Sequence, residues 1–116
     1  MKKRTVTTNK RTLTFSERVL KAALSIPAGK VTTYGAIARA AGGGVLGARS
    51  VTAVLERAWQ KGERAIPWHR VVYADGRIWI SPKYRAERMR LYEKEGIEID
   101  QKGRIRDFRD RLFEFD

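Results

Sequence analysis

Three consecutive glycines, Gly42-Gly43-Gly44, separate two segments that each have helical periodicity. The first, residues 34–41, carries Ile37 and Ala38 toward a core, and the second, residues 47–59, places its apolar side chains on one face. Glycines end a helix and allow a tight turn, so a mobile, tight-turning link is expected between the two helices. The pattern predicts a helix-turn-helix, in which the second helix is the usual DNA-contacting element.

A further helix is predicted before this pair. Thr14 and Glu17 have the Thr-x-x-Glu spacing of a capping box, apolar residues recur at helical spacing from Phe15 to Ile26, and Pro27 ends the run. Thr33 is predicted to be the N-cap of the helix over residues 34–41.

The second half of the chain predicts a hairpin and one more helix. An Asp75-Gly76 turn separates the strand-like residues 71–73 from residues 77–80, and Ser81-Pro82 opens a helix over residues 83–95 with Gly96 as its C-cap. Residues 97–116 are expected to add a short strand, then helix or coil. The fold class is therefore mainly α with a small β-hairpin, a winged helix-turn-helix-like DNA-binding domain. Residues 1–12 are predicted to be a basic flexible tail, and residues 13–116 a single domain.

Charge points to a polyanionic partner. The chain has a net charge of +12, and through Leu55 ten basic residues face one acidic residue. Such an excess attracts nucleic acid, and an anionic membrane only as a weaker partner. The absence of cysteine excludes disulfides, thiolate metal ligands and a cysteine nucleophile, and a single histidine argues against a histidine-based metal site. No cofactor and no metal are therefore expected. Without an apolar segment of membrane length or a signal peptide, a cytoplasmic protein is expected, nucleoid-associated if bacterial.

Four ordered motifs, "VTTYGAIARAAG", "ARSVTAVL", "IPWHRVV" and "EKEG", resemble the DNA-binding domain of the O6-alkylguanine-DNA alkyltransferases. In that family the third motif reads Pro-Cys-His-Arg-Val, and its cysteine accepts the alkyl group. Here Trp68 stands at that place, as in the alkyltransferase-like branch of the family. Indole has no basic lone pair and cannot act as the acceptor, so we expect no enzymatic activity.

The resemblance implies which residues contact DNA and rotate a nucleotide out of the duplex. Tyr34 matches the tyrosine that presses on the phosphate of the damaged nucleotide. Arg49 matches the arginine finger that enters from the minor groove and fills the space left by the extruded base. Small or polar neighbours, which allow a helix to approach a duplex closely, complete this predicted surface: Thr33, Ala48, Ser50 and Thr52.

The resemblance also implies a lesion pocket. Its predicted residues are Pro67, Trp68, His69, Arg70, Val71, Ser81 and Lys83. Lys83 stands where the alkyltransferase-like branch tends to have arginine, so discrimination among purines is expected to differ. His69 and Glu95 match the relay that activates the cysteine in the enzymes, and with no cysteine they are interpreted as structural remnants.

The function implied is recognition of O6-alkylguanine in double-stranded DNA. The base would be flipped into a pocket walled by Trp68, left unrepaired, and flagged for nucleotide excision repair proteins by a protein that is expected to be a monomer. The alternative is a sequence-specific winged-helix regulator, although the helix around Arg49 offers mainly small residues to the base edges. A third hypothesis, an alkyl-transferring enzyme, needs an acceptor that the chain lacks.

Overall fold

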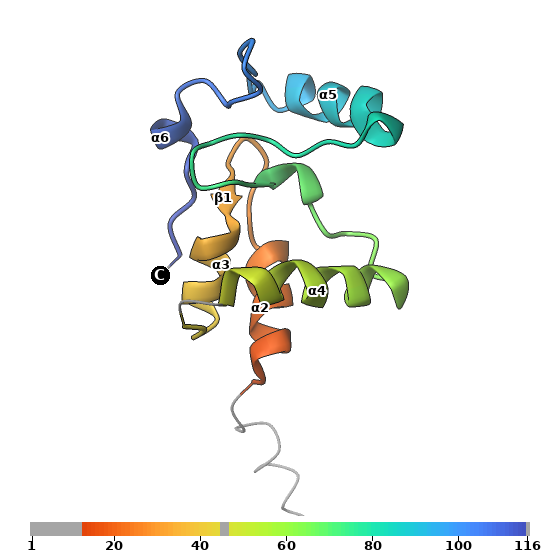
Figure 1. Ribbon diagram of the computed structural model, residues 1–116, viewed down its shortest axis with the longest axis vertical. Coiled ribbons are helices and arrows are strands. Elements are labelled where there is room, and N and C mark those ends of the chain that lie inside the picture. Colours follow the sequence, from red (N-terminus) through yellow and green to blue (C-terminus); the bar gives the residue numbers. More distant parts are fainter. Residues whose placement is uncertain (1–12, 45–46, 116) are drawn as a thin grey trace, which may run out of the picture.

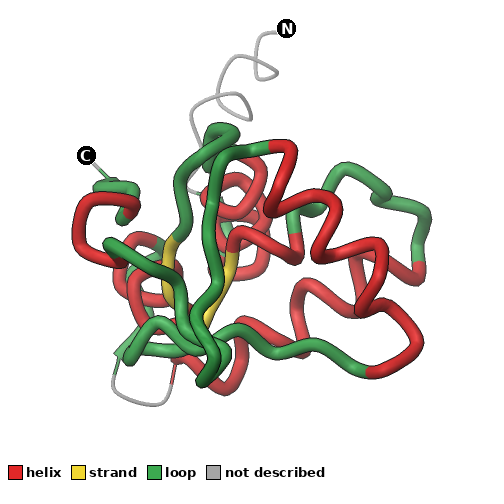
Figure 2. Tube along the Cα trace, turned by 90° about the horizontal axis from the view of Figure 1, so that it is seen from above, coloured by secondary structure: helices red, strands yellow, loops and turns green. Residues whose placement is uncertain are grey.

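The structure is a computed structural model that describes residues 13–44 and 47–115, so the predicted tail at residues 1–12 lies outside the described residues. Helices dominate, and a short sheet lies between them (Figure 1, Figure 2). The mainly helical class is thus confirmed. In chain order, the helices, 3-10 turns (η) and strands are α2 (Phe15–Leu24), β1 (Thr32–Thr33), α3 (Tyr34–Ala40), α4 (Gly47–Gln60), η1 (Trp68–Arg70), β2 (Val71–Val72), η2 (Pro82–Tyr84), α5 (Arg85–Lys94) and α6 (Phe108–Arg111).

The predicted capping box opens α2. The Thr14 hydroxyl accepts a hydrogen bond from the Glu17 N–H at 3.1 Å, and the Glu17 carboxylate accepts one from the Thr14 N–H at 2.8 Å. Each side chain therefore satisfies a backbone donor that the first turn of a helix leaves without a partner. The helix ends at Leu24, before Ile26, which is still buried in the core.

The predicted pair of helices joined through the glycine run is confirmed. The Thr33 hydroxyl accepts from the Ala36 N–H at 3.0 Å and caps α3. At the other end, Gly42 has a φ of +86°, a conformation that favours glycine. Gly47 allows α4 to lie close to α3, because it has no Cβ atom, and a Cβ atom at this position would lie only 3.0 Å from the Ala38 Cβ.

Two hydrophobic clusters lie on either side of the short sheet. The first joins α2, α3 and α4, and the second lies under α5 and the C-terminal segment. Strand β2 connects them because successive side chains of a strand point to opposite faces, which places Val71 in the first cluster and Val72 in the second. The candidate site is lined by residues from both groups of helices.

The predicted hairpin is wrong in its strand pairing. Strand β2 pairs in parallel with β1, with Thr32 opposite Val71. The Asp-Gly turn does form, since the Tyr73 N–H donates to the Arg77 carbonyl at 3.0 Å. The chain then leaves β2, and Arg77 forms an isolated antiparallel bridge with Arg104. The reason is burial: a strand covered on both faces fits between the two clusters, whereas in the segment after the turn exposed residues alternate with partly buried ones.

The helix predicted over residues 83–95 is shorter. Pro82 begins a 3-10 turn, and the α-helix starts at Arg85. Gly96, at a φ of +73°, follows the C-cap as predicted. Tyr92 is the residue of α5 that is buried, in agreement with its thin predicted apolar content. In the C-terminal segment the expected strand is reduced to a bridge between Ile99 and Ile105.

Replacing Gly76 with alanine is expected to destabilise the fold more than replacing Gly103. Both glycines have similar φ values, +85° and +79°. A Cβ atom at Gly76 would lie 3.0 Å from the Phe108 ring, whereas at Gly103 nothing lies within 4 Å. We expect Gly103→Ala to cost about 1 kcal/mol from backbone strain, and Gly76→Ala about 1–3 kcal/mol more from overpacking. Urea unfolding of both variants measures the difference, and equal losses would contradict a packing role for Gly76.

Candidate functional site

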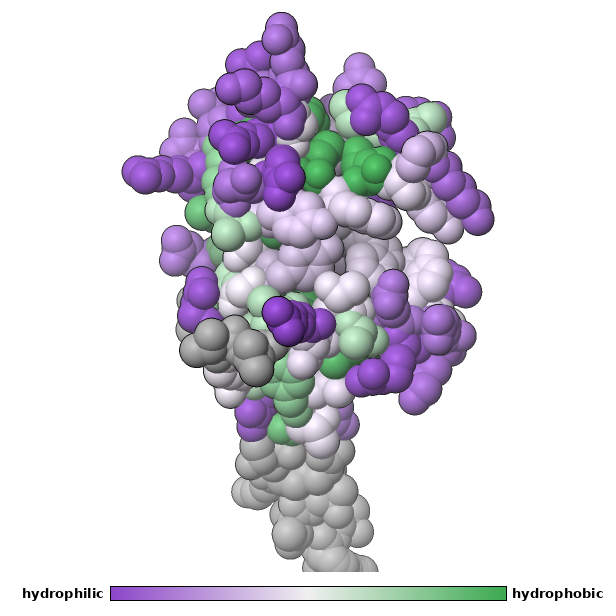
Figure 3. All heavy atoms as spheres, viewed as in Figure 1, coloured by the Kyte–Doolittle hydropathy of each residue, from purple (hydrophilic) through white to green (hydrophobic). Residues whose placement is uncertain are grey.

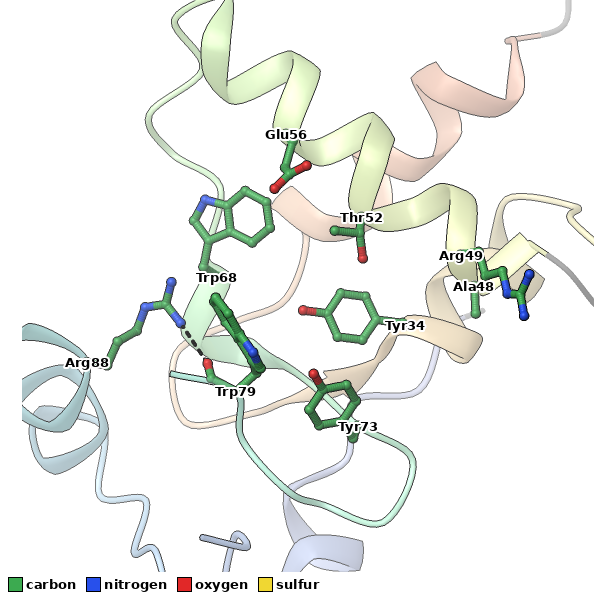
Figure 4. Close-up of a pocket in the computed structure, with 9 residues that line it drawn as sticks. All are labelled: Tyr34, Ala48, Arg49, Thr52, Glu56, Trp68, Tyr73, Trp79 and Arg88. Carbon is green, nitrogen blue, oxygen red and sulfur yellow. Dashed lines mark hydrogen bonds between the residues drawn. The ribbon is translucent and has the colours of Figure 1, made fainter. Parts of the chain in front are cut away.

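A cavity of about 410 Å³ opens between the helix-turn-helix and α5. Figure 4 shows its residues, which come from the start of α3, one side of α4, η1, the segment after β2, and α5. The lining residues are Tyr34, Ala48, Arg49, Thr52, Glu56, Trp68, Tyr73, Trp79 and Arg88. On the side of the molecule seen in Figure 1, a pale part of the surface lies between purple, hydrophilic side chains (Figure 3).

Four aromatic side chains line the cavity: Tyr34, Trp68, Tyr73 and Trp79. The Tyr34 and Tyr73 ring centroids are 6.0 Å apart, and the Trp68 ring meets Trp59 edge to face at 6.2 Å. Trp79 lies in front of Trp68 and is 56% exposed (Figure 4). An exposed tryptophan beside a half-buried one leaves ring faces free for a planar ligand.

Tyr34 is positioned by the cap of α3. Because Thr33 is the N-cap, Tyr34 is the first residue of the helix and its side chain reaches across the cavity toward Trp68 and Trp79 (Figure 4). Burial raises the pKa of the Tyr34 hydroxyl, and nearby Tyr73 raises it further. The hydroxyl therefore stays protonated at neutral pH and can donate a hydrogen bond.

A network of ionisable side chains positions the segment that carries Trp68. The Glu95 carboxylate accepts from Arg70 Nη2 at 2.6 Å and from the Gly29 N–H at 3.0 Å, and it lies 2.7 Å from His69 Nε2. Arg70 also donates to the Ile26 carbonyl at 2.8 Å. The network therefore fixes η1, which carries Trp68, against the end of α2 and the end of α5.

The protonation states of this network follow from its geometry. Burial alone would raise the pKa of Glu95, but hydrogen bonds from Arg70, Gly29 and His69 lower it to about 2. Burial lowers the pKa of His69, and the bond to Glu95 only partly opposes this shift. At neutral pH the pair is an ionised carboxylate and a neutral imidazole that donates from Nε2.

The stability of the protein is expected to fall as the pH is lowered from about 7 to about 5. Because the pKa of His69 is lowered in the folded protein, the unfolded chain binds a proton in this range that the folded protein does not. A second loss of stability comes from Glu95. It begins only below the ordinary carboxyl pKa of 4.5 and continues toward the Glu95 pKa of about 2 in the folded protein. Urea unfolding at several pH values measures both, and His69→Gln should remove the first. An unchanged slope in His69→Gln would contradict this assignment.

The structure places the predicted DNA-contacting residues at the start of α3 and α4. Ala48 lines the cavity, whereas Ser50 is exposed on the surface. Arg49 is exposed at the mouth of the cavity, and its guanidinium points away from the aromatic rings (Figure 4). A long cation in this position can reach a partner outside the protein.

The predicted lesion-pocket residues are only partly brought together. Trp68 lines the cavity, and Pro67, His69 and Arg70 line an adjoining cavity of about 640 Å³. Three predicted residues line neither of these two cavities: Val71, Ser81 and Lys83. Val71 is part of the hydrophobic core, and the Lys83 ammonium lies 5.4 Å from the centre of the Tyr84 ring.

Four lining residues were not predicted: Glu56, Tyr73, Trp79 and Arg88. A helical signal for one of them exists, since Glu56 follows Ala48 and the predicted Thr52 at intervals of four and therefore continues their stripe along α4. Arg88 had no comparable signal, because α5 is polar around most of its circumference.

Neither a metal-binding cluster nor a membrane-spanning helix is found in the described residues. Across residues 13–44 and 47–115 there is no group of three or more His, Cys, Asp or Glu side chains that could hold a metal ion. In the same part of the chain, no helix has the length and apolar character needed to span a bilayer.

The sequence matches a known family. Residues 14–97 match the family described as 6-O-methylguanine DNA methyltransferase, DNA binding domain. The DNA base-flipping protein of Escherichia coli (strain K12) is 38% identical over 92 residues, which are 78% of this chain and 68% of that protein. Alkyltransferase-like protein 1 of Schizosaccharomyces pombe is 40% identical over 90 residues, 75% of this chain and 80% of that protein.

Similarity to solved structures agrees with the family match. The S. pombe protein Atl1, in complex with damaged DNA containing O6-carboxymethylguanine, superposes with a TM-score of 0.70 at 33% identity, covering 87% of this chain and 95% of that one. The Mycobacterium tuberculosis O6-methylguanine methyltransferase gives a TM-score of 0.53 at 31% identity, covering 73% of this chain and 50% of that one. The likeness supports the predicted winged-helix-like class.

Proposed function

The chain belongs to the family of the 6-O-methylguanine DNA methyltransferase DNA-binding domain, and on this premise we propose that it recognises O6-alkylguanine in duplex DNA without repairing it. Two relatives support the proposal by name, a DNA base-flipping protein and an alkyltransferase-like protein. The crystal structure of S. pombe Atl1 in complex with damaged DNA that contains O6-carboxymethylguanine gives further support.

The observation that carries the proposal is Trp68 in the wall of the cavity. It stands in the motif Pro67-Trp68-His69-Arg70-Val71, at the place of the alkyl-accepting cysteine of the enzymes. The His69–Glu95 pair of the relay is present 2.7 Å apart, but the chain has no cysteine for it to activate. A flat, apolar ring at this place suits stacking against a flipped base rather than bond formation.

The residues around the cavity have the chemistry that base extrusion needs. Tyr34 would press on the backbone of the lesion nucleotide, and Arg49 would enter the duplex and occupy the space of the extruded base. Thr33, Ala48 and Ser50 would let α3 and α4 lie close to the DNA. Extrusion costs about a few kcal/mol and least at a weakened base pair, which itself favours the lesion.

A stable, distorted complex would be the signal that the protein passes on. With no chemical step to release it, the bound lesion stays flipped, and nucleotide excision repair proteins are the proposed partners that act on this complex. The net charge of +12 supports binding to the phosphate backbone, with an affinity that falls as salt rises.

The test compares duplexes with and without one O6-methylguanine. Fluorescence anisotropy at fixed salt should give tighter binding to the damaged duplex, and mass spectrometry should find the methyl group still on the DNA. Arg49→Ala should weaken lesion binding more than Arg57→Ala, a matched change on α4 at an exposed residue outside both cavities. Equal affinity for both duplexes would overturn the proposal, and a mass increase on the protein would support an enzyme instead.

A further inference from the structure

Two opposite charges face the aromatic cavity from different helices. Glu56 approaches from α4 and Arg88 from α5, and both line this cavity and the adjoining one (Figure 4). They flank Trp68, the ring against which a flipped base would stack. The cavity is therefore not only apolar: it has an acceptor on one side and a donor on the other.

These two charges do not neutralise each other. The ion pairs found across residues 13–44 and 47–115 do not join Glu56 to Arg88, and within the same residues the Glu56 carboxylate accepts no hydrogen bond. Arg88 uses one N–H group, which donates to the Trp79 carbonyl at 3.3 Å. Glu56 is exposed, so water solvates its carboxylate in the free protein. Where bound DNA displaces that water, the carboxylate needs a hydrogen-bond donor from the ligand.

Both charges act on the same point inside the cavity. The pKa of the Tyr34 hydroxyl is raised first by burial and then by Tyr73, while Arg88 acts to lower it and Glu56 to raise it. The Tyr34 hydroxyl points into the space between the two helices (Figure 4). A base held beside this hydroxyl would lie close to both the Glu56 carboxylate and the Arg88 guanidinium.

The arrangement matches the two edges of a guanine-type base. An O6-alkylguanine keeps a 2-amino donor on one edge and the N7 and O6 acceptors on the opposite edge. We propose that Glu56 accepts a hydrogen bond from the 2-amino group of the flipped base, and that Arg88 donates to its N7 and O6 atoms. The site is thus selective for 2-aminopurines that carry an acceptor at N7. This inference rests on the proposed function.

The experiment removes one atom group from the base at a time. Four duplexes differ at a single nucleotide: O6-methylguanine, O6-methylhypoxanthine without the 2-amino group, 7-deaza-O6-methylguanine without N7, and guanine. Anisotropy at fixed salt should show a Kd about tenfold higher for each of the two depleted lesions than for O6-methylguanine.

Matched variants assign each effect to its residue. Glu56→Ala should abolish the difference between O6-methylguanine and O6-methylhypoxanthine and leave the 7-deaza effect in place, and Arg88→Ala should do the reverse. Because a change of charge shifts the affinity for all DNA, the ratio of Kd values between duplexes is the readout. Glu93→Ala and Arg90→Ala, on exposed residues of α5 outside both cavities, are the controls.

The outcomes separate the two proposals. A wild-type protein that prefers O6-methylguanine to guanine but does not distinguish the depleted lesions would overturn the edge-reading inference alone. Discrimination that survives in Glu56→Ala and Arg88→Ala would also overturn it. A wild-type protein without preference for O6-methylguanine over guanine would overturn the proposed function itself, and the inference with it.

Discussion

Replacing Glu95 with alanine is expected to lower the free energy of unfolding by about 3–5 kcal/mol, the effect of removing one partner from a buried ion pair. Only 6% of the Glu95 side chain is exposed, and it bonds Arg70, His69 and the Gly29 N–H. Its loss leaves the Arg70 guanidinium without its carboxylate and the His69 and Gly29 donors without an acceptor. Urea unfolding at neutral pH measures the change.

The matched control for this prediction is Glu93→Ala. Glu93 lies two residues earlier in α5 and is exposed, so its removal is expected to change the free energy of unfolding by less than about 0.5 kcal/mol. Similar losses in the two variants would contradict a structural role for the Glu95 network. The contrast also tests the interpretation of the relay as a remnant, because that interpretation assigns Glu95 to stability.

The elements predicted correctly from the sequence depend on local signals. The caps at Thr14 and Thr33 need only a side chain and a backbone N–H three residues away, so their spacing in the sequence is sufficient. The pairing of β2 could not be found this way. Its partner strand β1 lies far earlier in the chain, since the paired residues Thr32 and Val71 are 39 positions apart. The pairing depends on burial of Val71 and Val72 against two separate clusters.

The same distinction applies to the site. Trp68, Tyr34 and Ala48 were predicted because they stand in motifs, and the structure brings them to one cavity. Arg88 and Trp79 were missed because their place depends on how α5 and the segment after β2 fold over η1, which no short pattern encodes. Lys83, although in a motif, lies outside both cavities, because η2 turns the chain before α5 begins.

Replacing Trp68 with alanine is expected to remove most of the preference for damaged DNA. Stacking of a base on an aromatic side chain contributes about 1–3 kcal/mol, which corresponds to about 5- to 150-fold in Kd. Trp68 lines both the cavity that contains Tyr34 and the adjoining cavity, so its ring is the wall against which the flipped base would lie (Figure 4). Binding to undamaged DNA should change little, because the phosphate contacts remain.

The ratio of the Kd values for undamaged and damaged duplexes is therefore the measurement, and Trp59→Ala is the matched control. Trp59 lines the adjoining cavity but not the one that contains Tyr34, and it touches Trp68 edge to face. If the lesion stacks on Trp68, the ratio should fall in Trp68→Ala and persist in Trp59→Ala. A full lesion preference in Trp68→Ala would mean that the base is held elsewhere, since a site that relies on Tyr34 and Arg49 alone would not need the indole ring.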